Sequence, residues 1–459
     1  MRALPNILFE KLPSSEQSSF RQLTSLSFLL HAWLNIDRTN KRSRGIDDIS
    51  IGDFQRDLGA RLGEIALKIK NRSFRFHRLK AKAIPKKSLL PSGEPRPIRI
   101  PAVRDRVVLK ALQFLLMPRL ARFDAPFSYG YRPNISTFHA ISHARQLCQK
   151  YTHVLEADIK SYFESVDRTR LRKVLFRVQK LTSIQDLLEG ALDLETEIGN
   201  EVKPADRKFF LNDDEGIPQG SALSPLLANL FLSYFDLMMA KKGWELVRYA
   251  DDLIIFAQSV DDAKKADQQA REIMQVLGLD MHPLLDGPAA KTRLRAIKTD
   301  GVEFVGYRIQ SGQLQPGPKS MAHFRKDIEN ITDVKSIGRG YFGGRGHGED
   351  NLITRAIAIK RKVQGKAASL AHCDPCQEIA QLSEIIKKRY LGMFQIVGMT
   401  VDIKDVAKAK VLGTPDLALE WINKNAEAKA DAPIVVPQAD DAILWAKKMG
   451  HEILRVFSN

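Results

Sequence analysis

The stretch ELVRYADDLIIFAQS, residues 245–259, places two adjacent acids between two runs of apolar, β-branched and aromatic residues. This pattern predicts a β-hairpin over 245–258 with Asp251 and Asp252 at its turn. Two acids at a turn are also ordinary turn chemistry, because short carboxylates hydrogen-bond to their own backbone. By average composition, such a string arises by chance in roughly a few per cent of chains this long. Its meaning therefore depends on whether the rest of the chain supplies other parts of the same site.

A third acid stands at the end of another apolar run, in VLEADIKSYFESVD, residues 154–167. Asp158 ends that predicted strand, and Phe163 follows where a turn can bring its ring back beside the acids. Considered singly, Asp158 is best interpreted as the cap of a helix or turn, and Phe163 as an aromatic ring of the hydrophobic core. With Asp251 and Asp252, however, Asp158 completes the set that nucleotidyl transfer needs, because Mg²⁺ is usually held by a few carboxylates and substrate phosphates. An aromatic ring beside such a site would stack on the sugar and exclude a 2′-hydroxyl.

Between these acids lies GIPQGSALSPLLAN, residues 216–229, a loop rich in glycine and proline before an apolar run. A Gly-Pro turn leading into a capped helix is its structural explanation. Its functional explanation is that small residues, Gly220 and Ser221 among them, let the backbone approach a base pair closely. Gln219 would then hydrogen-bond the template or the nucleotide.

The composition favours a polyanionic partner. The 459 residues carry a formal net charge of +17, and the sequence pI is about 9.6. Nucleic acid is the simplest partner for such a chain, and a merely soluble basic protein is the alternative. Three cysteines, a low and odd number, argue against a disulfide scaffold and suit the cytoplasm. The string CDPC at 373–376 has the spacing of half a zinc site, but without a second half we favour two ordinary thiols at a turn.

The pattern of the chain predicts a mixed α+β body up to about residue 318 and a helical part beyond it. The apolar stretch at 23–36 is too short to span a bilayer, and we expect it to pack on the body as a helix. Periodicity predicts the following segments: helices over 16–35, 52–72, 107–123, 135–150, 224–243 and 261–279, short extended pieces over 74–108, a strand and turn over 152–163, and a strand over 301–309. Residues 338–350 read as a glycine-rich loop and 423–440 as a linker before a last helix.

Taken together, these strings resemble the bacterial, group II intron-like reverse transcriptases. Asp158 with Phe163 resembles the first catalytic motif, GIPQGSALSP the second and YADD the third, in the family's order and spacing. AAKTRL, with Lys291, resembles the lysine motif that follows, although DGPAA lengthens the link before it. FVGYRI resembles the strand that grips the primer, and SRGIDDISIGDF, AIPKK, EPRPIRIPAVRDRVV and YGYRPNIS resemble the fingers motifs. The resemblance covers about residues 40–310.

The resemblance implies a right-hand polymerase of α+β class. Its parts would be an N-terminal helical extension (1–40), fingers (41–150), a palm with an antiparallel sheet (151–318) carrying an insertion (192–215), a helical thumb (319–425), and a linker with a C-terminal helix (426–459).

The resemblance also implies roles for single residues. The catalytic metal ligands would be Asp158, Asp251 and Asp252, holding two Mg²⁺ ions for which Mn²⁺ can substitute. Nucleotide binding would involve Lys86, Arg96, Arg99, Phe163, Gln219 and Lys291, with Phe163 selecting deoxynucleotides and Arg96 the best placed of the basic residues for the triphosphate. Primer and template would contact Tyr249, Gly220 and Ser221, and RNA backbone would contact Arg339 and Arg345 of the glycine-rich loop.

The expected function is RNA-directed DNA synthesis in the cytoplasm. The enzyme would copy a bound, structured noncoding RNA into cDNA from deoxynucleoside triphosphates. We expect no membrane among its partners. Since no endonuclease cysteine pairs, RNase H region, integrase or fused Cas1 is visible, we expect a stand-alone enzyme, and such relatives often serve antiphage defence. One alternative is an intron or retroelement polymerase that lacks its endonuclease. An RNA-dependent RNA polymerase is opposed by Phe163, and an idle RNA-binding protein by the intact acids. Priming and oligomeric state stay open, with a homo-oligomer among the alternatives.

Overall fold

A four-stranded antiparallel sheet lies at the centre of the chain, with strand order β5-β6-β3-β7. The structure is a computed structural model that describes residues 16–85, 94–179, 181–210, 215–287, 290–333, 352–395, 415–430 and 436–458. The sheet consists of β3 (His153–Asp158), β5 (Leu246–Tyr249), β6 (Asp252–Ala257) and β7 (Arg293–Ala296). The predicted hairpin around Asp251 and Asp252 is therefore confirmed, as is the strand that ends at Asp158.

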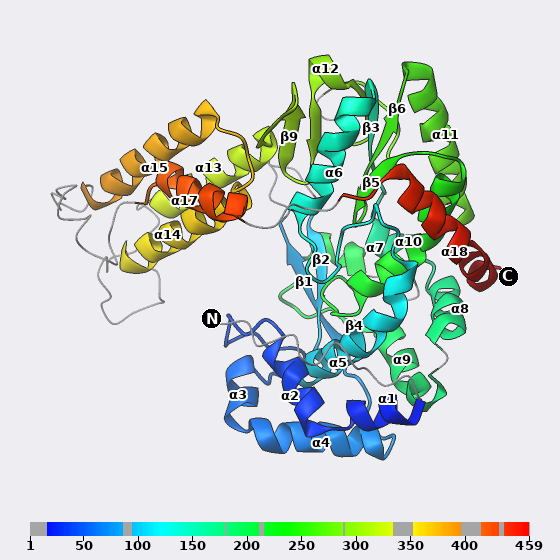
Figure 1. Cartoon of the computed structure of the whole chain (residues 1–459). Coiled ribbons are helices and arrows are strands. Elements are labelled where there is room, and N and C mark those ends of the chain that lie inside the picture. The colour runs from blue at the N-terminus through cyan, green and yellow to red at the C-terminus, as the bar shows by residue number, and fades with distance from the viewer. Residues whose placement is uncertain are drawn as a thin grey trace.

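Both faces of this sheet are covered, which explains why the central strand β6 is apolar from Leu253 to Ala257. Side chains alternate between faces along a strand. Leu155 and Ile255 join one core with α10 (Ser224–Lys241) and α11 (Val260–Val276), whereas Val154 and Phe256 join a second core with α6 (Thr137–Lys150). Figure 1 shows the helices packed around the central strands. The two cores hold the sheet rigidly, so the acids at its end are fixed by buried structure.

A second sheet has the order β2-β1-β4. The antiparallel hairpin of β1 (Leu79–Ile84) and β2 (Arg96–Ile100) is joined in parallel by the short strand β4 (Thr196–Glu197). The predicted insertion at 192–215 thus adds an edge strand to this hairpin. It continues as the 3₁₀ helix η3 (Pro204–Phe210).

The N-terminal helices pack against this part of the body. They are α1 (Glu16–Leu23), α2 (Leu26–Leu34), α3 (Ile51–Arg56) and α4 (Leu58–Lys70), and α2 lies on α5 (Val103–Leu120). Phe28, Leu29 and Trp33 of α2 are buried, so the apolar stretch at 23–36 packs on the body as expected. Two predicted helices are split: Ser25 caps a new helix inside 16–35, and Asp57 interrupts 52–72. Residues 103–106, expected to be extended, already belong to α5.

The single strand expected over 301–309 is wrong, because the chain folds there into a tight hairpin. Strands β8 (Val302–Phe304) and β9 (Tyr307–Gln310) pair antiparallel, and β10 (Gln313–Pro316) pairs with β9. The two turn residues, Val305 and Gly306, have φ of 45° and 87°. Positive φ at both central positions gives the turn twist that matches antiparallel strands. The apolar run hid this turn, because valine rarely adopts such a backbone.

The described residues beyond 318 are mainly helical, as predicted. Four helices, α13 (Pro318–Thr332), α14 (Leu352–Ser369), α15 (Gln377–Gln395) and α17 (Leu417–Ala430), pack together and project from the body (Figure 1). Helix α17 continues to Ala430, so the first part of the expected 423–440 linker is helical instead. Helix α18 (Ala439–Phe457) returns to the body and packs on α10 and α8 (Arg168–Gln179).

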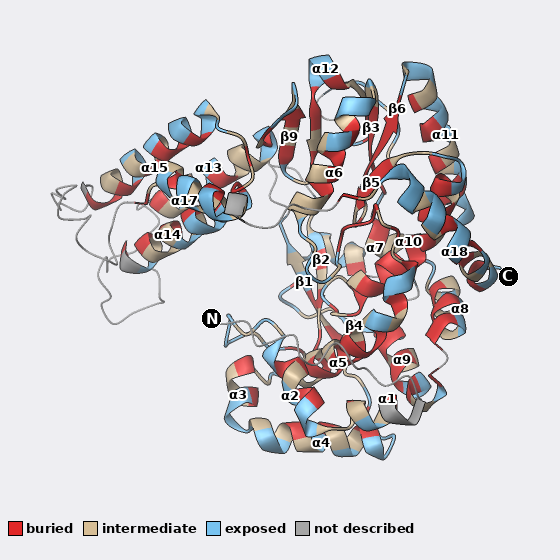
Figure 2. Cartoon of the chain, in the orientation of Figure 1, coloured by how far each residue is buried: buried red, intermediate tan, exposed pale blue. Residues whose placement is uncertain are grey.

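The remaining short elements are η1 (Ala121–Phe123), α7 (Tyr162–Ser165), η2 (Thr182–Ile184), α9 (Gln185–Leu192) and α12 (Ile297–Asp300). Figure 2 shows that buried residues concentrate in the central sheet and in the inner faces of the helices. Among the described helices, none has the length and apolar character needed to cross a membrane.

Candidate active site

Three carboxylates gather at one end of the central sheet. Asp158 and Asp252 face each other as paired positions of β3 and β6, and Asp251 belongs to the turn between β5 and β6. This is the juxtaposition that the sequence predicts. The carboxylates lie close enough to influence one another's ionisation.

Burial and mutual repulsion disfavour full ionisation of this cluster. Burial, followed by the charges of Asp251 and Asp158, raises the pKa of Asp252 to about 7. The pKa of Asp251 is also raised, chiefly by burial. The Lys291 Nζ lies 2.9 Å from Asp158 Oδ2 and supplies one positive charge. Clustered carboxylates of this kind are stabilised by added cations.

The carboxylate oxygens of Asp158, Asp251 and Asp252 are of the kind that binds Mg²⁺. Within the described ranges, no three His, Cys, Asp or Glu side chains form a ready-made metal site. Mg²⁺ is usually bound through one or two carboxylates together with substrate phosphates and water. The hard oxygen donors of Asp158, Asp251 and Asp252 match that mode.

The acidic turn is held from beneath by a buried arginine. The Arg248 guanidinium donates to both Asp236 carboxylate oxygens at 2.8 and 2.5 Å, and to the Ala250 carbonyl oxygen at 3.0 Å. Ala250 has φ of 59°, an uncommon conformation for a residue with a Cβ. A Cβ on Gly130 would collide with the Ala250 backbone, so only a glycine at position 130 lets the turn at Ala250 pack this closely. These contacts fix the backbone immediately before Asp251.

The loop at 216–221 ties the second sheet to the central one. The Arg99 N–H donates to the Gln219 carbonyl at 2.7 Å, and the Ile217 N–H to the Phe163 carbonyl at 2.7 Å. Gly220 has φ of 121°, and a Cβ there would collide with the Arg99 carbonyl. The Gln219 side chain donates to Glu164 at 2.7 Å. Gln219 is thereby held beside the half-buried ring of Phe163.

Most of the predicted site residues line one cavity of about 930 Å³. Those that line it are Asp158, Asp251, Asp252, Arg96, Arg99, Phe163, Gln219 and Lys291. Tyr249, Gly220 and Ser221 do not, although Tyr249 pairs with Asp252 across the hairpin. The buried Ser221 hydroxyl accepts from the Leu223 N–H at 3.3 Å, so it is turned toward the loop itself. Lys86, Arg339 and Arg345 lie outside the described residues.

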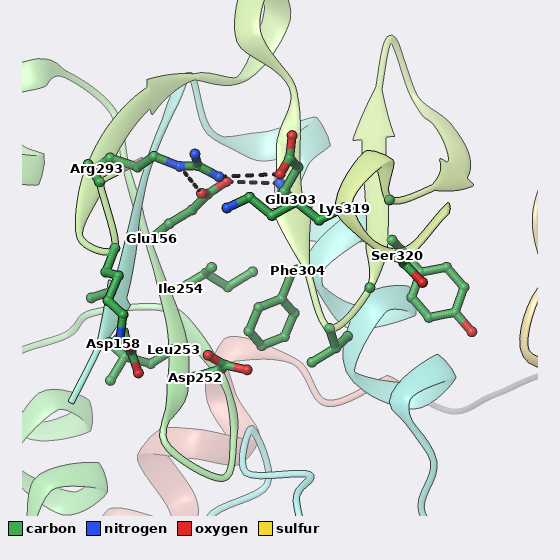
Figure 3. A pocket seen from close by; sticks show the side chains of 17 residues that line it. Glu156, Asp158, Asp252, Leu253, Ile254, Arg293, Glu303, Phe304, Lys319 and Ser320 are labelled. Carbon is green, nitrogen blue, oxygen red and sulfur yellow. Dashed lines mark hydrogen bonds and ion pairs between the residues drawn. The ribbon is translucent and has the colours of Figure 1, made fainter. Parts of the chain in front are cut away.

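A smaller cavity of about 260 Å³ adjoins the acids on the side of the β8–β9 hairpin. Figure 3 shows Asp158 and Asp252 at one end and an ion-pair network at the other, with the Phe304 ring between them. In that network Arg293 Nε lies 2.5 Å from Glu156 Oε2, and Arg293 also reaches Glu303 at 3.4 Å. The Val305–Gly306 turn lines the same cavity. The hairpin thus stands directly beside the carboxylates.

Sequence reasoning missed several residues at the site. His282 Nε2 lies 3.1 Å from Lys291 Nζ, because its backbone pairs with the end of β3. Tyr131 stands edge-on to Phe163, with ring centroids 6.4 Å apart. His282 carries no sequence signal, since it reaches the site through tertiary contacts, whereas Tyr131 belongs to the fingers string YGYRPNIS, in which no single residue was assigned a role. Arg248 was visible inside the quoted hairpin, and its place on an otherwise apolar strand was a signal of a buried partner.

Comparisons with known proteins agree with this geometry. Residues 84–309 match the family described as reverse transcriptase (RNA-dependent DNA polymerase). Protein YkfC of Escherichia coli is 28% identical over 262 residues, covering 48% of this chain and 64% of that protein. The group II intron-encoded protein LtrA of Lactococcus lactis is 26% identical over 145 residues, covering 32% of this chain and 23% of that protein.

Among solved structures, telomerase from Candida albicans in complex with a fragment of telomeric RNA is similar at 12% identity and a TM-score of 0.40, covering 88% of this chain and 67% of that one. The chain spans less than two thirds of the length of either curated relative. The family match covers β2 and β4 of the second sheet, the central sheet with its three acids, and the β8–β9 hairpin up to residue 309. Residues 84–309 therefore form a reverse transcriptase domain, of the RNA-dependent DNA polymerase family.

Proposed function

We propose that the protein makes cDNA on a bound, structured noncoding RNA by two-metal nucleotidyl transfer from deoxynucleoside triphosphates. The observation that carries the proposal is that Asp158, Asp251 and Asp252 share one cavity with Phe163 and with several cations. In this proposal the central sheet is the palm, the β1–β2 hairpin belongs to the fingers, and α13 to α17 form the thumb. The net charge of +17 supports binding of a nucleic acid.

Asp158, Asp251 and Asp252 would hold two Mg²⁺ ions, or Mn²⁺ as a substitute, whose chemistry is neutralisation of charge on the attacking and leaving oxygens. Arg96 would bind the triphosphate, since a guanidinium suits phosphate oxygens. Lys291 opens onto the same cavity and adds positive charge there. Gln219 would contact the nucleotide or the template base, and Tyr249 would lie along the primer end beside Asp252.

Phe163 would select deoxynucleotides by occupying the space that a 2′-hydroxyl needs. Its ring is held by Tyr162 and Tyr131, with ring centroids 5.7 and 6.4 Å away. We predict that Phe163→Val lets the enzyme use ribonucleotides, raising the ratio of kcat/KM for ribonucleotide over deoxynucleotide by about tenfold or more, on the order of 1–3 kcal/mol of lost discrimination. Primer extension with each nucleotide set measures the ratio.

Tyr131→Phe is a suitable control, because it keeps the ring edge beside Phe163 and removes only a hydroxyl. A Phe163→Val protein that still excludes ribonucleotides as strictly as wild type would place the gate elsewhere.

We further propose that the enzyme acts in the cytoplasm as a stand-alone reverse transcriptase in antiphage defence. This rests on the resemblance described above, and the similarity to a group II intron-encoded protein keeps a retroelement role as the alternative. Sequencing the RNA that co-purifies from cells discriminates them: a single noncoding RNA encoded beside the gene supports defence, and an intron RNA supports the alternative. Phage plating with wild type and Asp251→Asn/Asp252→Asn then tests whether protection needs synthesis.

A further inference from the structure

The segment from 192 to 215 is fastened to the body at both of its ends. At its start, the Leu79 N–H donates to the Glu195 carbonyl at 2.7 Å, and the Arg78 side chain pairs with Glu195 at 2.9 Å. Farther along, Lys80 pairs with Glu201 at 3.0 Å. At its end, Arg168 donates to the Gly216 and Glu215 carbonyls at 3.1 and 3.2 Å. The segment therefore bridges the β1–β2 hairpin and the loop beside Phe163.

Arg99 is one of the residues that hold this bridge. Its Nε donates to Thr196 Oγ1 at 3.0 Å, and its guanidinium stands 5.5 Å over the Phe210 ring. Phe210 is buried and packs with Ala81 and Val202. The Arg99 side chain is itself only 8% exposed. Arg99 was expected to bind phosphate. Its guanidinium instead contacts Thr196 and Phe210 of the segment from 192 to 215.

The segment also contributes to the cavity that contains the acids. Lys208 and Phe209 of η3 line it together with Arg96 and the carboxylates. Among the described residues, five lysines and arginines line the cavity: Arg96, Arg99, Arg168, Lys208 and Lys291. Arg99 and Arg168 are engaged with the segment, and Lys291 is paired with Asp158. Arg96 and Lys208 are exposed, and within the described parts of the chain neither has a salt-bridge partner.

We infer that Lys208 binds the triphosphate of the incoming nucleotide, together with Arg96. This rests on the proposed function and assigns the segment from 192 to 215 a part in it. The carboxylates enter the cavity from the central sheet, and the two exposed cations enter from the second sheet and η3. A nucleotide whose phosphates approach the acids enters the cavity that these two cations also line. The Phe209 ring lies 5.0 Å from the Lys208 Nζ and restrains that side chain at the cavity.

The test compares Lys208→Ala with a matched variant, Lys203→Ala. Lys203 is an exposed lysine of the same segment that does not line the cavity. Both variants remove the same charge, so an effect of net charge alone would be equal in the two. Each protein is assayed for the KM of dGTP and for kcat on an RNA template with a DNA primer. Direct binding of fluorescent dGTP and of the template–primer duplex is measured in parallel.

We expect Lys208→Ala to raise the KM and the Kd for dGTP about tenfold, the loss of one charge-assisted hydrogen bond. The Kd for template–primer should not change, Lys208→Arg should restore dGTP binding, and Lys203→Ala should behave as wild type. Unchanged dGTP affinity in Lys208→Ala, or an equal loss in Lys203→Ala, would overturn the inference. So would weaker template–primer binding with unchanged dGTP affinity, since Lys208 would then serve the nucleic-acid backbone. Failure of wild type to incorporate nucleotides would count against the proposed function, and the dGTP binding data would still decide the role of Lys208.

Discussion

At the scale of single residues, Arg248 explains how an alanine in an uncommon backbone conformation can precede the two acids of the hairpin turn. Arg248 and Asp236 are fully buried, and the guanidinium also reaches the Ala250 carbonyl. Removing one partner of such a pair costs about 3–5 kcal/mol, whereas replacing both with apolar residues is often neutral. We predict that Arg248→Met with Asp236→Leu folds with near wild-type stability but loses about tenfold or more in kcat, because the turn has lost its donor.

Thermal unfolding and single-turnover primer extension check this prediction together. The Arg248→Met single variant is the control, and it should be strongly destabilised by the unpaired Asp236 carboxylate. A double variant with recovered stability and a wild-type rate would show that the pair serves the core alone.

The three acids also predict how the protein responds to pH and to Mg²⁺. Burial holds the pKa of Asp252 at about 7, above its ordinary value of 3.8, so the folded protein binds this proton more tightly than the unfolded chain. The contribution of Asp252 to stability is therefore present below pH 4 and is lost as the pH rises through about 7. We expect the Tm to fall on this account between pH 5 and pH 8 without metal.

Mg²⁺ should raise the Tm at pH 8, by an amount that corresponds to about 2.7 kcal/mol at a hundredfold excess over its Kd. Asp251→Asn/Asp252→Asn removes the repulsion, so this variant should be at least as stable as wild type without metal and should not respond to Mg²⁺. An equal Mg²⁺ shift in both proteins would mean that the ion binds elsewhere. Thermal scans with and without EDTA provide the comparison.

At the scale of elements, the β8–β9 hairpin joins the acids to the helices that follow. The Gly317 N–H donates to the Gly306 carbonyl at 2.9 Å, and a Cβ at Gly317 would lie 2.8 Å from the Gly306 carbonyl carbon. Gly317→Ala should therefore push α13 away from the hairpin. We predict about a tenfold higher Kd for template–primer. The KM for dGTP should change little, because the second sheet, which carries the proposed triphosphate-binding residue Arg96, is not altered.

Gly365→Ala is the matched control, since this glycine lies inside α14 with open space around its Cβ position. It should leave primer binding unchanged and add a little helix stability. Equal affinities for Gly317→Ala and Gly365→Ala would show that the junction does not govern primer binding.

The sequence predicts the central elements well because their signals are local. An apolar strand, an acidic turn and a Gly-Pro loop each appear in contiguous letters, and Asp158, Asp251 and Asp252 come together because β3 and β6 pair. The sequence predicts a single strand where the chain forms the hairpin at 302–310, because Val305 adopts a backbone conformation that its residue type disfavours. The contacts of Arg99 with Thr196 and Phe210, and those of Lys208, could not be predicted, since they depend on how an insertion folds back across the body.

At the scale of the whole molecule, the last helix described returns to the body instead of extending the helices before it. Phe457 is buried beside Phe231 and Tyr234, and Arg122 pairs with Glu452 at 2.7 Å. We predict that Phe457→Ala lowers the free energy of unfolding by about 3–5 kcal/mol, because it opens a cavity between α18, α8 and α10. Urea unfolding measures the change.

Leu444→Ala is the control for this prediction, because Leu444 lies on the same helix with 66% of its surface exposed. Its substitution should change stability by less than about 0.5 kcal/mol. A Phe457→Ala protein as stable as wild type would mean that α18 is not part of the folded body.

The most direct test of the central claim is incorporation of labelled nucleotides by purified protein on an RNA template with a DNA primer. Wild type is compared with Asp251→Asn/Asp252→Asn in Mg²⁺, with deoxynucleotides and ribonucleotides in parallel. We predict deoxynucleotide incorporation by wild type and a loss of about a thousandfold or more in the variant, with the fold and RNA binding retained. Equal incorporation by the two proteins would contradict the assignment of these carboxylates, and a preference for ribonucleotides would contradict the proposal that the product is DNA.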